Sequence, residues 1–156
     1  MKNTIIFDNK PGFRAGDALV FFISENLGFE TKTKTLLPTI SNKVKAYLKI
    51  LKHKKKVKEK IVSFDLSEEN KALFIIVKNS STLENFRALG AELFSFSSNN
   101  KIEKINLYAD SIKSINVKEK NNVEIVSNLV HGFKLKSYSF NKYKTDHRKN
   151  FYFFKI

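Results

Sequence analysis

The sequence contains no cysteine, and this absence removes several classes of chemistry at once. A chain without cysteine has no disulfide framework, no thiol nucleophile and no zinc–cysteine site. Long apolar runs are also missing, because the longest, Ala18 to Ile23 and Ala72 to Val77, fall far short of the ~20 residues that cross a bilayer. The N-terminal segment reaches Asp8 before it builds the apolar core of a signal peptide. We therefore expect a cytoplasmic protein with no membrane partner.

Arginine is scarce, although the chain is strongly basic. The formal net charge is +14, and it comes from 26 lysines and only 3 arginines. Arginine is the residue that reads base edges and clamps phosphates with two hydrogen bonds, whereas scattered lysine is typical of a solvated surface. The charge alone is therefore weak support for a nucleic-acid partner.

Glycine-rich phosphate loops are absent as well. No GxGxxG or GxxxxGK[ST] string occurs, and the predicted strand that ends at Val77-Lys78-Asn79-Ser80 is not followed by glycine. Glycine is what lets a backbone approach a phosphate closely. We expect no cofactor site in this chain.

Groups that could carry catalysis are few and scattered. The chain has 5 aspartates, 10 glutamates and 3 histidines, and the one adjacent carboxylate pair, Glu68-Glu69, lies in a predicted turn where neighbours point apart. Ser137, Ser139 and His131 are close in sequence, but no nucleophile elbow surrounds them. We predict no catalytic residue and no metal site, so this chain alone is not expected to be an enzyme.

What the sequence does contain is an alternation of strand and helix patterns. Its 156 residues, 42% of them hydrophobic, suffice for one domain with a real core. Apolar runs and period-two patterns predict strands at 3–7, 18–24, 61–66, 72–78, 102–109 and 151–156. The run Ala18 to Ser24 is typical of a strand buried on both faces. We interpret the final run as an edge strand or as a place where a larger protein was cut, and 25–37 and 110–120 as loops.

Two helices are predicted between these strands. The first spans Ser41 to Leu51, and its buried stripe is Val44, Leu48 and Leu51. The second begins with Ser81 as cap and Glu84 as its capping-box partner, and turn residues 97–100 end it. The expected buried stripe of the second helix is Leu83, Phe86, Leu89, Leu93 and Phe94. Gly90 within it predicts close approach to a neighbouring element.

A third helix begins at Asn121, where Glu124 completes a capping pattern. Residues spaced for one helical face predict its buried stripe: Val123, Val126, Leu129, Val130 and Phe133. Past Lys136, aromatic residues alternate with polar ones. We interpret this part as an extended segment along a surface.

The densest charge run is Lys52 to Lys60. Its lysines could contact phosphate groups, and the candidates are Lys54, Lys55, Lys56 and Lys58. The alternative, which the like charges favour, is an exposed connector. His53 lacks a nearby carboxylate or second histidine, so we do not expect it to bind a metal.

The segment from His131 to Thr145, HGFKLKSYSFNKYKT, resembles the end of the N-terminal domain of the leucyl (cytosol) aminopeptidase family. His131, Lys136 and Asn141 depart from the family pattern, which has an acid, a glycine and an acid at these places. The string FRALGAELF and the sequence Asp17-Ala18-Leu19-Val20 also resemble that family. Within the segment His131 to Thr145, the residues that match the family pattern are Gly132, Leu135, Ser137, Tyr138, Phe140, Tyr143, Lys144 and Thr145. In macro domains an aspartate near such a strand can read an adenine, but we favour a structural role for Asp17.

The resemblance implies an α/β fold, a three-layer αβα sandwich with a mixed sheet that is macro-domain-like and spans 1–156 as one domain. It implies a non-catalytic domain of a metallo-exopeptidase that releases N-terminal amino acids. In the family, two divalent metals, zinc or manganese, sit in a C-terminal catalytic domain whose Asn-Thr-Asp-Ala-Glu-Gly-Arg signature does not occur in this chain. The expected partners are that catalytic domain and further copies in a hexamer.

Two functional hypotheses follow. In the first, the chain is the aminopeptidase N-terminal domain, serving assembly or regulation, and Tyr138, Phe140, Tyr143 and Lys144 form an interface. In the second, the chain is a stand-alone basic macro-like module that binds nucleic acid or a nucleotide. There the lysines of 52–60 would contact phosphates, and Tyr138 or Tyr143 would stack on a base.

Overall fold

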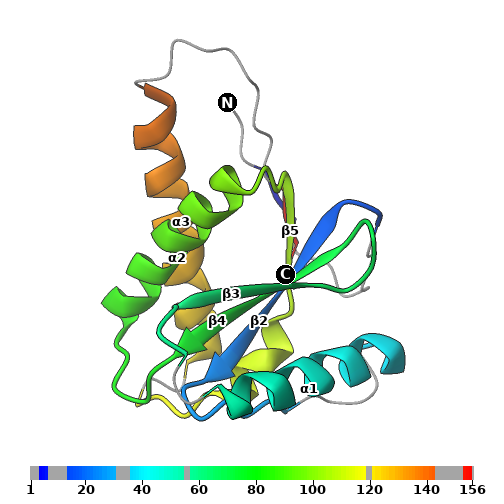
Figure 1. The fold of residues 1–156 in the computed structure, drawn as a ribbon. Coiled ribbons are helices and arrows are strands. Elements are labelled where there is room, and N and C mark those ends of the chain that lie inside the picture. Colours follow the sequence, from blue (N-terminus) through cyan, green and yellow to red (C-terminus); the bar gives the residue numbers. More distant parts are fainter. Residues whose placement is uncertain are drawn as a thin grey trace.

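Strands from both ends of the chain join those of the middle in one mixed sheet, with helices on each face (Figure 1). The computed structural model describes residues 4–6, 14–30, 36–54, 57–118, 121–142 and 153–155, with side chains in the ranges 14–30, 36–54, 57–118 and 121–138. The elements are, in chain order, β1 (Thr4–Ile6), β2 (Asp17–Ser24), α1 (Pro38–His53), β3 (Ile61–Asp65), β4 (Lys71–Val77), α2 (Leu83–Asn99), β5 (Lys104–Leu107), the 3₁₀ helix η1 (Ala109–Ser114), α3 (Asn122–Lys142) and β6 (Phe153–Lys155).

The described strands form a six-stranded sheet in the order β1-β6-β5-β2-β4-β3. The neighbouring pairs β1–β6, β6–β5, β5–β2 and β2–β4 are all parallel, and β3 pairs antiparallel with β4 as a hairpin. The mixed sheet and the hairpin confirm the sequence-based prediction. The expectation of an edge strand at the chain's end was wrong, because β6 lies between β1 and β5 and β1 takes the edge.

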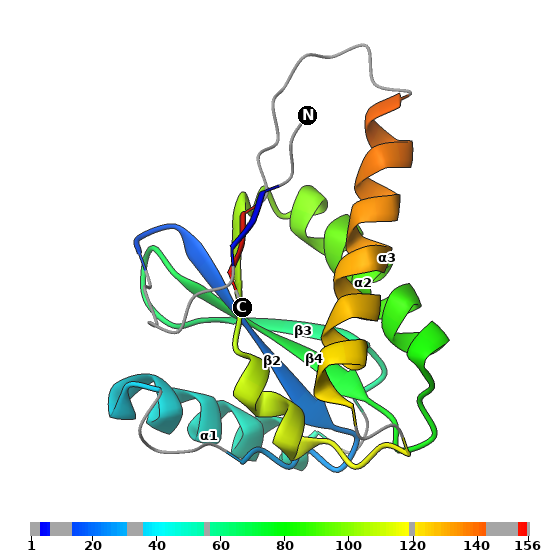
Figure 2. The same cartoon turned by 180° about the vertical axis from the view of Figure 1, so that it is seen from behind.

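Two separate cores make the molecule a three-layer αβα sandwich. Figure 2 shows α2 and α3 on the opposite side of the sheet from α1. One core joins the sheet to α2 and α3 and the other joins it to α1, with Val44, Leu48 and Leu51 buried in the second as predicted.

The central strand β2 feeds both cores. All eight of its residues are buried. Val20 and Phe22 belong to the core under α2 and α3, while Leu19, Phe21 and Ile23 belong to the core under α1. Successive side chains point to opposite faces of a strand, so a strand covered on both faces needs apolar side chains at successive positions. The apolar run Ala18 to Ser24 therefore forms a strand buried on both faces, as predicted.

Helices α2 and α3 touch through glycine on both sides. A Cβ built on Gly90 would lie 1.9 Å from the carbonyl oxygen of Leu129, and one on Gly132 would lie 1.8 Å from that of Arg87. The backbones therefore approach as closely as only glycine permits. This confirms the close approach predicted at Gly90, and it gives the second glycine, known from sequence only as part of a motif, the same role.

The ends of α2 differ from the prediction. Thr82, not Ser81, precedes the helix, and its backbone N–H donates to Oδ1 of Asn85 at 2.8 Å, so Glu84 is not the capping partner. The helix also continues to Asn99 instead of turning at Ser97. Ser97 lies four residues after Leu93, on the same buried face, and its side chain is fully buried.

Helix α3 is longer than predicted, and its buried stripe, which includes Val126, Leu129 and Phe133 as predicted, differs in the first turn. It continues to Lys142, so Tyr138 and Phe140 are helical and the extended segment past Lys136 was wrong. No glycine or proline interrupts it after Gly132. Val123, expected in the buried stripe, is 73% exposed, while Ile125 is buried. Ile125, Leu129 and Phe133 recur every four residues, and Val123 is about 200° around the helix from Ile125.

The segment after β5 also departs from the prediction. The strand is shorter than 102–109, and the expected loop 110–120 begins with η1, in which Ser111 and Ile112 are buried. The Oγ of Ser111 accepts a hydrogen bond from the backbone N–H of Phe22 at 2.8 Å. Beyond the end of β5, the side chain of Ser111 thus replaces a strand as the hydrogen-bond partner of β2 at Phe22.

Candidate functional site

A basic groove lies where the carboxyl ends of β2 and β4 meet the end of α1. Its volume is about 440 Å³. Figure 1 shows the arrowheads of β2 and β4 beside this end of α1. Three segments line the groove: Glu25 to Leu27, residues 52, 54 and 57–60 from the end of α1 and the connection to β3, and Ile76 and Lys78 at the end of β4.

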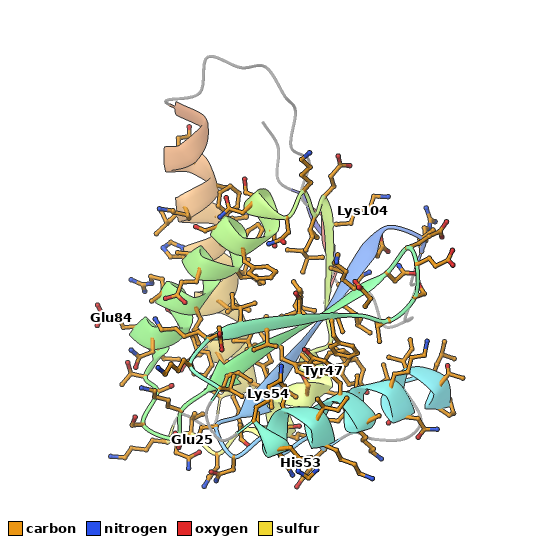
Figure 3. All side chains as sticks on the ribbon, in the orientation of Figure 1. Glu25, Tyr47, His53, Lys54, Glu84 and Lys104 are labelled. Atoms are coloured by element: carbon orange, nitrogen blue, oxygen red, sulfur yellow. The ribbon has the colours of Figure 1, made fainter. Side chains whose placement is uncertain are left out.

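Lysine dominates the walls of this groove. Lys60 is paired with Glu92 on α2. The other four, Lys52, Lys54, Lys58 and Lys78, are exposed, and within the described residues none has a carboxylate partner. Figure 3 labels Lys54 near the end of α1, on the same side of the molecule as Glu25.

The two negative groups of the groove, Glu25 and Glu59, offset only part of the charge of these lysines. Glu25 accepts a hydrogen bond from the backbone N–H of Asn79 at 3.1 Å through its Oε1, which ties the loop after β2 to the loop after β4. Glu59 is the other acid in the lining. The groove therefore keeps a positive potential.

The floor of the groove is aliphatic and rests on a strained residue. Leu27, Val57 and Ile76 line it, and Leu27 is 92% buried. Leu27 has φ 57°, in the left-handed region that bulky side chains avoid. Its N–H donates to the carbonyl oxygen of Ser24 at 2.8 Å, and the N–H of Gly28 donates to the Oγ of Ser24 at 2.9 Å. The tight turn thus places an apolar side chain beneath the lysines.

At the carboxyl ends of β2 and β5, side chains of the described residues pack against one another. The connection after β2 leads to α1 on one face of the sheet, and the connection after β5 leads to η1 and α3 on the other face. In open α/β sheets, ligands bind at the carboxyl edge between two such strands. Phe21 instead packs against Phe29 and Tyr108, with ring centroids 5.5 and 5.7 Å apart. The backbone N–H of Glu30 donates to Ser114 Oγ at 2.7 Å and holds the two connections together.

Asp17 has the surroundings of a structural carboxylate. It is 95% buried at the amino end of β2, far along the strand from the edge where α/β sheets bind ligands. Its Oδ2 accepts hydrogen bonds from the N–H of Arg14 at 3.1 Å and from Nδ2 of Asn106 at 3.0 Å. Asn70 donates through Nδ2 to the carbonyl oxygen of Asp17 at 3.1 Å. Asp17 thus links β2 to β5 through Asn106 and to the residue before β4 through Asn70, in agreement with the role favoured from sequence.

The predicted interface residues are only partly described. Tyr138 lies on α3 and is 80% exposed, and Leu135, three residues earlier, is 54% exposed. Phe140 belongs to α3, but its side chain lies outside the described ones, and Tyr143 and Lys144 lie outside the described residues. Of the predicted phosphate contacts, Lys54 and Lys58 line the groove, while Lys55 and Lys56 lie outside the described part of the chain.

The sequence reasoning missed two parts of this groove. Lys78 was noted only because it stands where a glycine was expected, and Leu27 was placed in a loop. Their joint position depends on β2 and β4 being neighbours, which the sequence does not display. Over the described ranges, no group of three or more His, Asp or Glu side chains is arranged to hold a metal ion. Over the same ranges, no helix is long and apolar enough to span a membrane.

Comparison with known proteins gives one family and one fold. The sequence matches the N-terminal domain of the cytosol aminopeptidase family over residues 20–147. A search of curated protein sequences finds no match. A tomato leucine aminopeptidase mutant is similar in structure, with a TM-score of 0.64 and 11% identity, over 99% of this chain and 32% of that one. The chain thus spans about a third of the tomato protein.

Two bacterial macrodomains are similar over nearly their whole length. The macrodomain of Mycobacterium tuberculosis DarG has a TM-score of 0.63 and 13% identity, over 99% of this chain and 98% of that one. The macrodomain of Thermus aquaticus DarG has a TM-score of 0.61 and 10% identity, over 98% and 96%. At these identities the likeness is one of fold, and it makes the sandwich macrodomain-like.

Proposed function

Because this chain belongs to the cytosol aminopeptidase family, whose N-terminal domain it matches, we propose that it is the non-catalytic N-terminal domain of a leucyl aminopeptidase. The family match over residues 20–147 carries the proposal, and the lack of a metal-holding group in the described residues supports it. The two divalent metals, zinc or manganese, would then belong to a C-terminal catalytic domain. The assembled protein would release N-terminal amino acids.

The role of the domain in this proposal is assembly, through the outer face of α3. In both views α3 extends past the end of α2 (Figures 1 and 2). Leu135 and Tyr138 are three residues apart, so they are neighbours on the helix surface, and both are exposed. A leucine beside a tyrosine offers apolar area with a polar tip, which suits the centre of a protein interface. Phe140, Tyr143 and Lys144 would extend this interface.

The test is association with the catalytic domain of the aminopeptidase from the same organism, produced separately with manganese or zinc. Calorimetry would measure binding of the 156-residue chain, and light scattering would measure the mass of the complex, a hexamer being expected. The double variant Leu135→Glu/Tyr138→Glu should weaken binding by about tenfold or more, because central interface residues carry most of the binding energy.

Val123→Glu is the matched control, since it introduces a charge at an exposed apolar residue at the other end of the same helix. It should bind as the unchanged protein does. Absence of binding by the unchanged chain would refute the assembly role. Hydrolysis of leucine amides by the purified chain with manganese or zinc would refute the non-catalytic role.

The alternative, a stand-alone module that binds nucleic acid or a nucleotide, gains little support at the ends of β2 and β5. That is where an open α/β sheet would hold a nucleotide, and among the described residues the rings of Phe21, Phe29 and Tyr108 pack together beside these strand ends. Tyr138, the proposed stacking platform, is on α3, on the opposite face of the sheet from α1 and its lysines.

A further inference from the structure

The basic groove at the end of α1 has a composition that neither the aminopeptidase assembly nor the core requires. Between Glu30 and Glu59 the sequence contains ten lysines and no acidic residue. The fold brings the end of this acid-free stretch to Lys78, directly after β4, and to the strained turn at Leu27. Four exposed ammonium groups around one hollow outnumber its two carboxylates, Glu25 and Glu59, so an anion bound between the lysines would lower the energy of the arrangement.

We propose that this groove binds a ligand with two or more adjacent phosphate groups, held by Lys52, Lys54, Lys58 and Lys78. Its volume of about 440 Å³ is in the range of small-molecule sites. Lysine is a point charge with three donors and suits phosphate, whereas planar two-point recognition of a carboxylate needs arginine, which the described lining lacks. Multivalent phosphate therefore fits better than a carboxylate ligand.

The floor of the groove indicates what the rest of the ligand is. Leu27, Val57 and Ile76 present aliphatic surface below the lysines, and this surface can cover the face of a flat apolar group such as a nucleobase. No aromatic ring belongs to the described lining, so the groove lacks the stacking platform that strand-binding proteins use. A free nucleotide di- or triphosphate therefore fits better than a single-stranded nucleic acid.

The position of the groove separates it from the ends of β2 and β5. It lies at the β2–β4 side of the carboxyl edge, and Lys52, Lys54 and Lys58 give it a charged wall. The hydrogen bond between Glu25 and the N–H of Asn79 fixes the two loops that form the opposite wall. The strain at Leu27 agrees with a functional role, because backbone outliers cluster at binding sites.

The test is titration of the 156-residue chain at 0.15 M salt with tripolyphosphate, ATP and an oligothymidylate of fifteen nucleotides, each followed by calorimetry. Binding of tripolyphosphate and ATP supports the proposal. Tighter binding of ATP than of tripolyphosphate would assign the floor to the base. If the oligonucleotide binds most tightly, the phosphates come from a nucleic-acid strand, which supports the site and overturns the choice of a free nucleotide.

A charge-matched pair of variants separates the groove from the overall charge. Lys54→Glu/Lys58→Glu reverses two groove lysines and should weaken ATP binding by about tenfold or more. Lys45→Glu/Lys49→Glu changes the net charge equally at two exposed positions of α1 outside the groove, and should weaken binding no more than about twofold. Unchanged thermal midpoints would show that both variants fold.

Two results would overturn the proposal. One is absence of binding of all three ligands to the unchanged chain at 0.15 M salt. The other is an equal loss of ATP binding in the two double variants, because this would mean that the general charge of the surface, and not the groove, attracts the anion.

Discussion

At the scale of single residues, Gly90 sets the distance between α2 and α3. A methyl group there would overlap the carbonyl oxygen of Leu129, and neither backbone can give way without separating the helices. We expect Gly90→Ala to lower the free energy of unfolding by roughly 1–3 kcal/mol, as overpacking does. The contact between Phe94 and Phe133, with centroids 5.3 Å apart, should loosen at the same time. Urea denaturation and the chemical shifts of these rings would measure the two effects.

Gly16→Ala is the control, because it strains the backbone without a steric clash. Gly16 has φ 85°, and a Cβ there would meet nothing within 4 Å. It should cost about 1–2 kcal/mol through its left-handed conformation and leave the ring shifts of Phe94 and Phe133 unchanged. Unaltered stability of Gly90→Ala would contradict the close contact.

On α3, the residue pattern identified residues that share one face of the helix, but it did not show which residues of the first turn lie on the buried side. The spacing of Leu129 and Phe133 on α3 was recognised correctly, yet Val123 was counted with them and Ile125 was not. A residue in the first turn is buried only if the partner helix reaches it. That depends on the crossing through Gly90 and Gly132, which no local pattern contains.

At the scale of elements, η1 acts as the continuation of β5 along β2. Ser111 accepts a hydrogen bond from the N–H of Phe22, a group that has no access to water inside the sheet. Ser111→Ala should therefore destabilise the fold by about 1–3 kcal/mol, the cost of a buried donor left without a partner. Thermal or urea denaturation would measure it.

Ser97→Ala gives the matching comparison, because both serines are fully buried. The Oγ of Ser97 has no hydrogen-bond partner among the described residues, so its removal should be neutral or stabilising by up to about 1 kcal/mol. Similar losses in the two variants would show that the bond to Phe22 contributes little.

Elements were predicted well where a pattern is long and poorly at their ends. The strands β2, β3 and β4 and the core of α1 agree with their apolar patterns. The alternating aromatics past Lys136 predict an extended segment, but a helix already packed through Gly132 and Phe133 extends at little cost when neither glycine nor proline follows. The groove has the same limit: the run 52–60 predicts part of its lysines, while Leu27 and Lys78 come from segments far from that run in the sequence.

At the scale of the whole molecule, the two ends of the chain have unequal roles in the sheet. In the described structure β1 pairs with β6 alone, while β6 pairs with both β1 and β5. Deleting residues 1–10 should therefore remove one edge ladder, and amides of β5 should keep their slow hydrogen exchange. Deleting 151–156 should expose β5 and leave β1 without a neighbour, so exchange in Lys104–Leu107 should accelerate. Equal protection of β5 in the two deletions would contradict this strand order.

The sheet order was beyond the reach of sequence patterns. Apolar runs indicated strands at both ends, and the family resemblance indicated a macro-like sandwich, but neither says that the last strand enters between the first and the fifth. Pairing between distant segments is decided by the fit of whole layers and not by local propensity.

This strand order also determines when the edge of the sheet can form during synthesis of the protein. The ribosome makes β1 about 150 residues before β6, the strand against which it lies, and at about 5–20 residues per second this separates the two strands by roughly 10–30 s of synthesis. Throughout that interval β1 has no partner strand to pair with. Pairing of β1 therefore has to wait until the nascent polypeptide has been extended through β6.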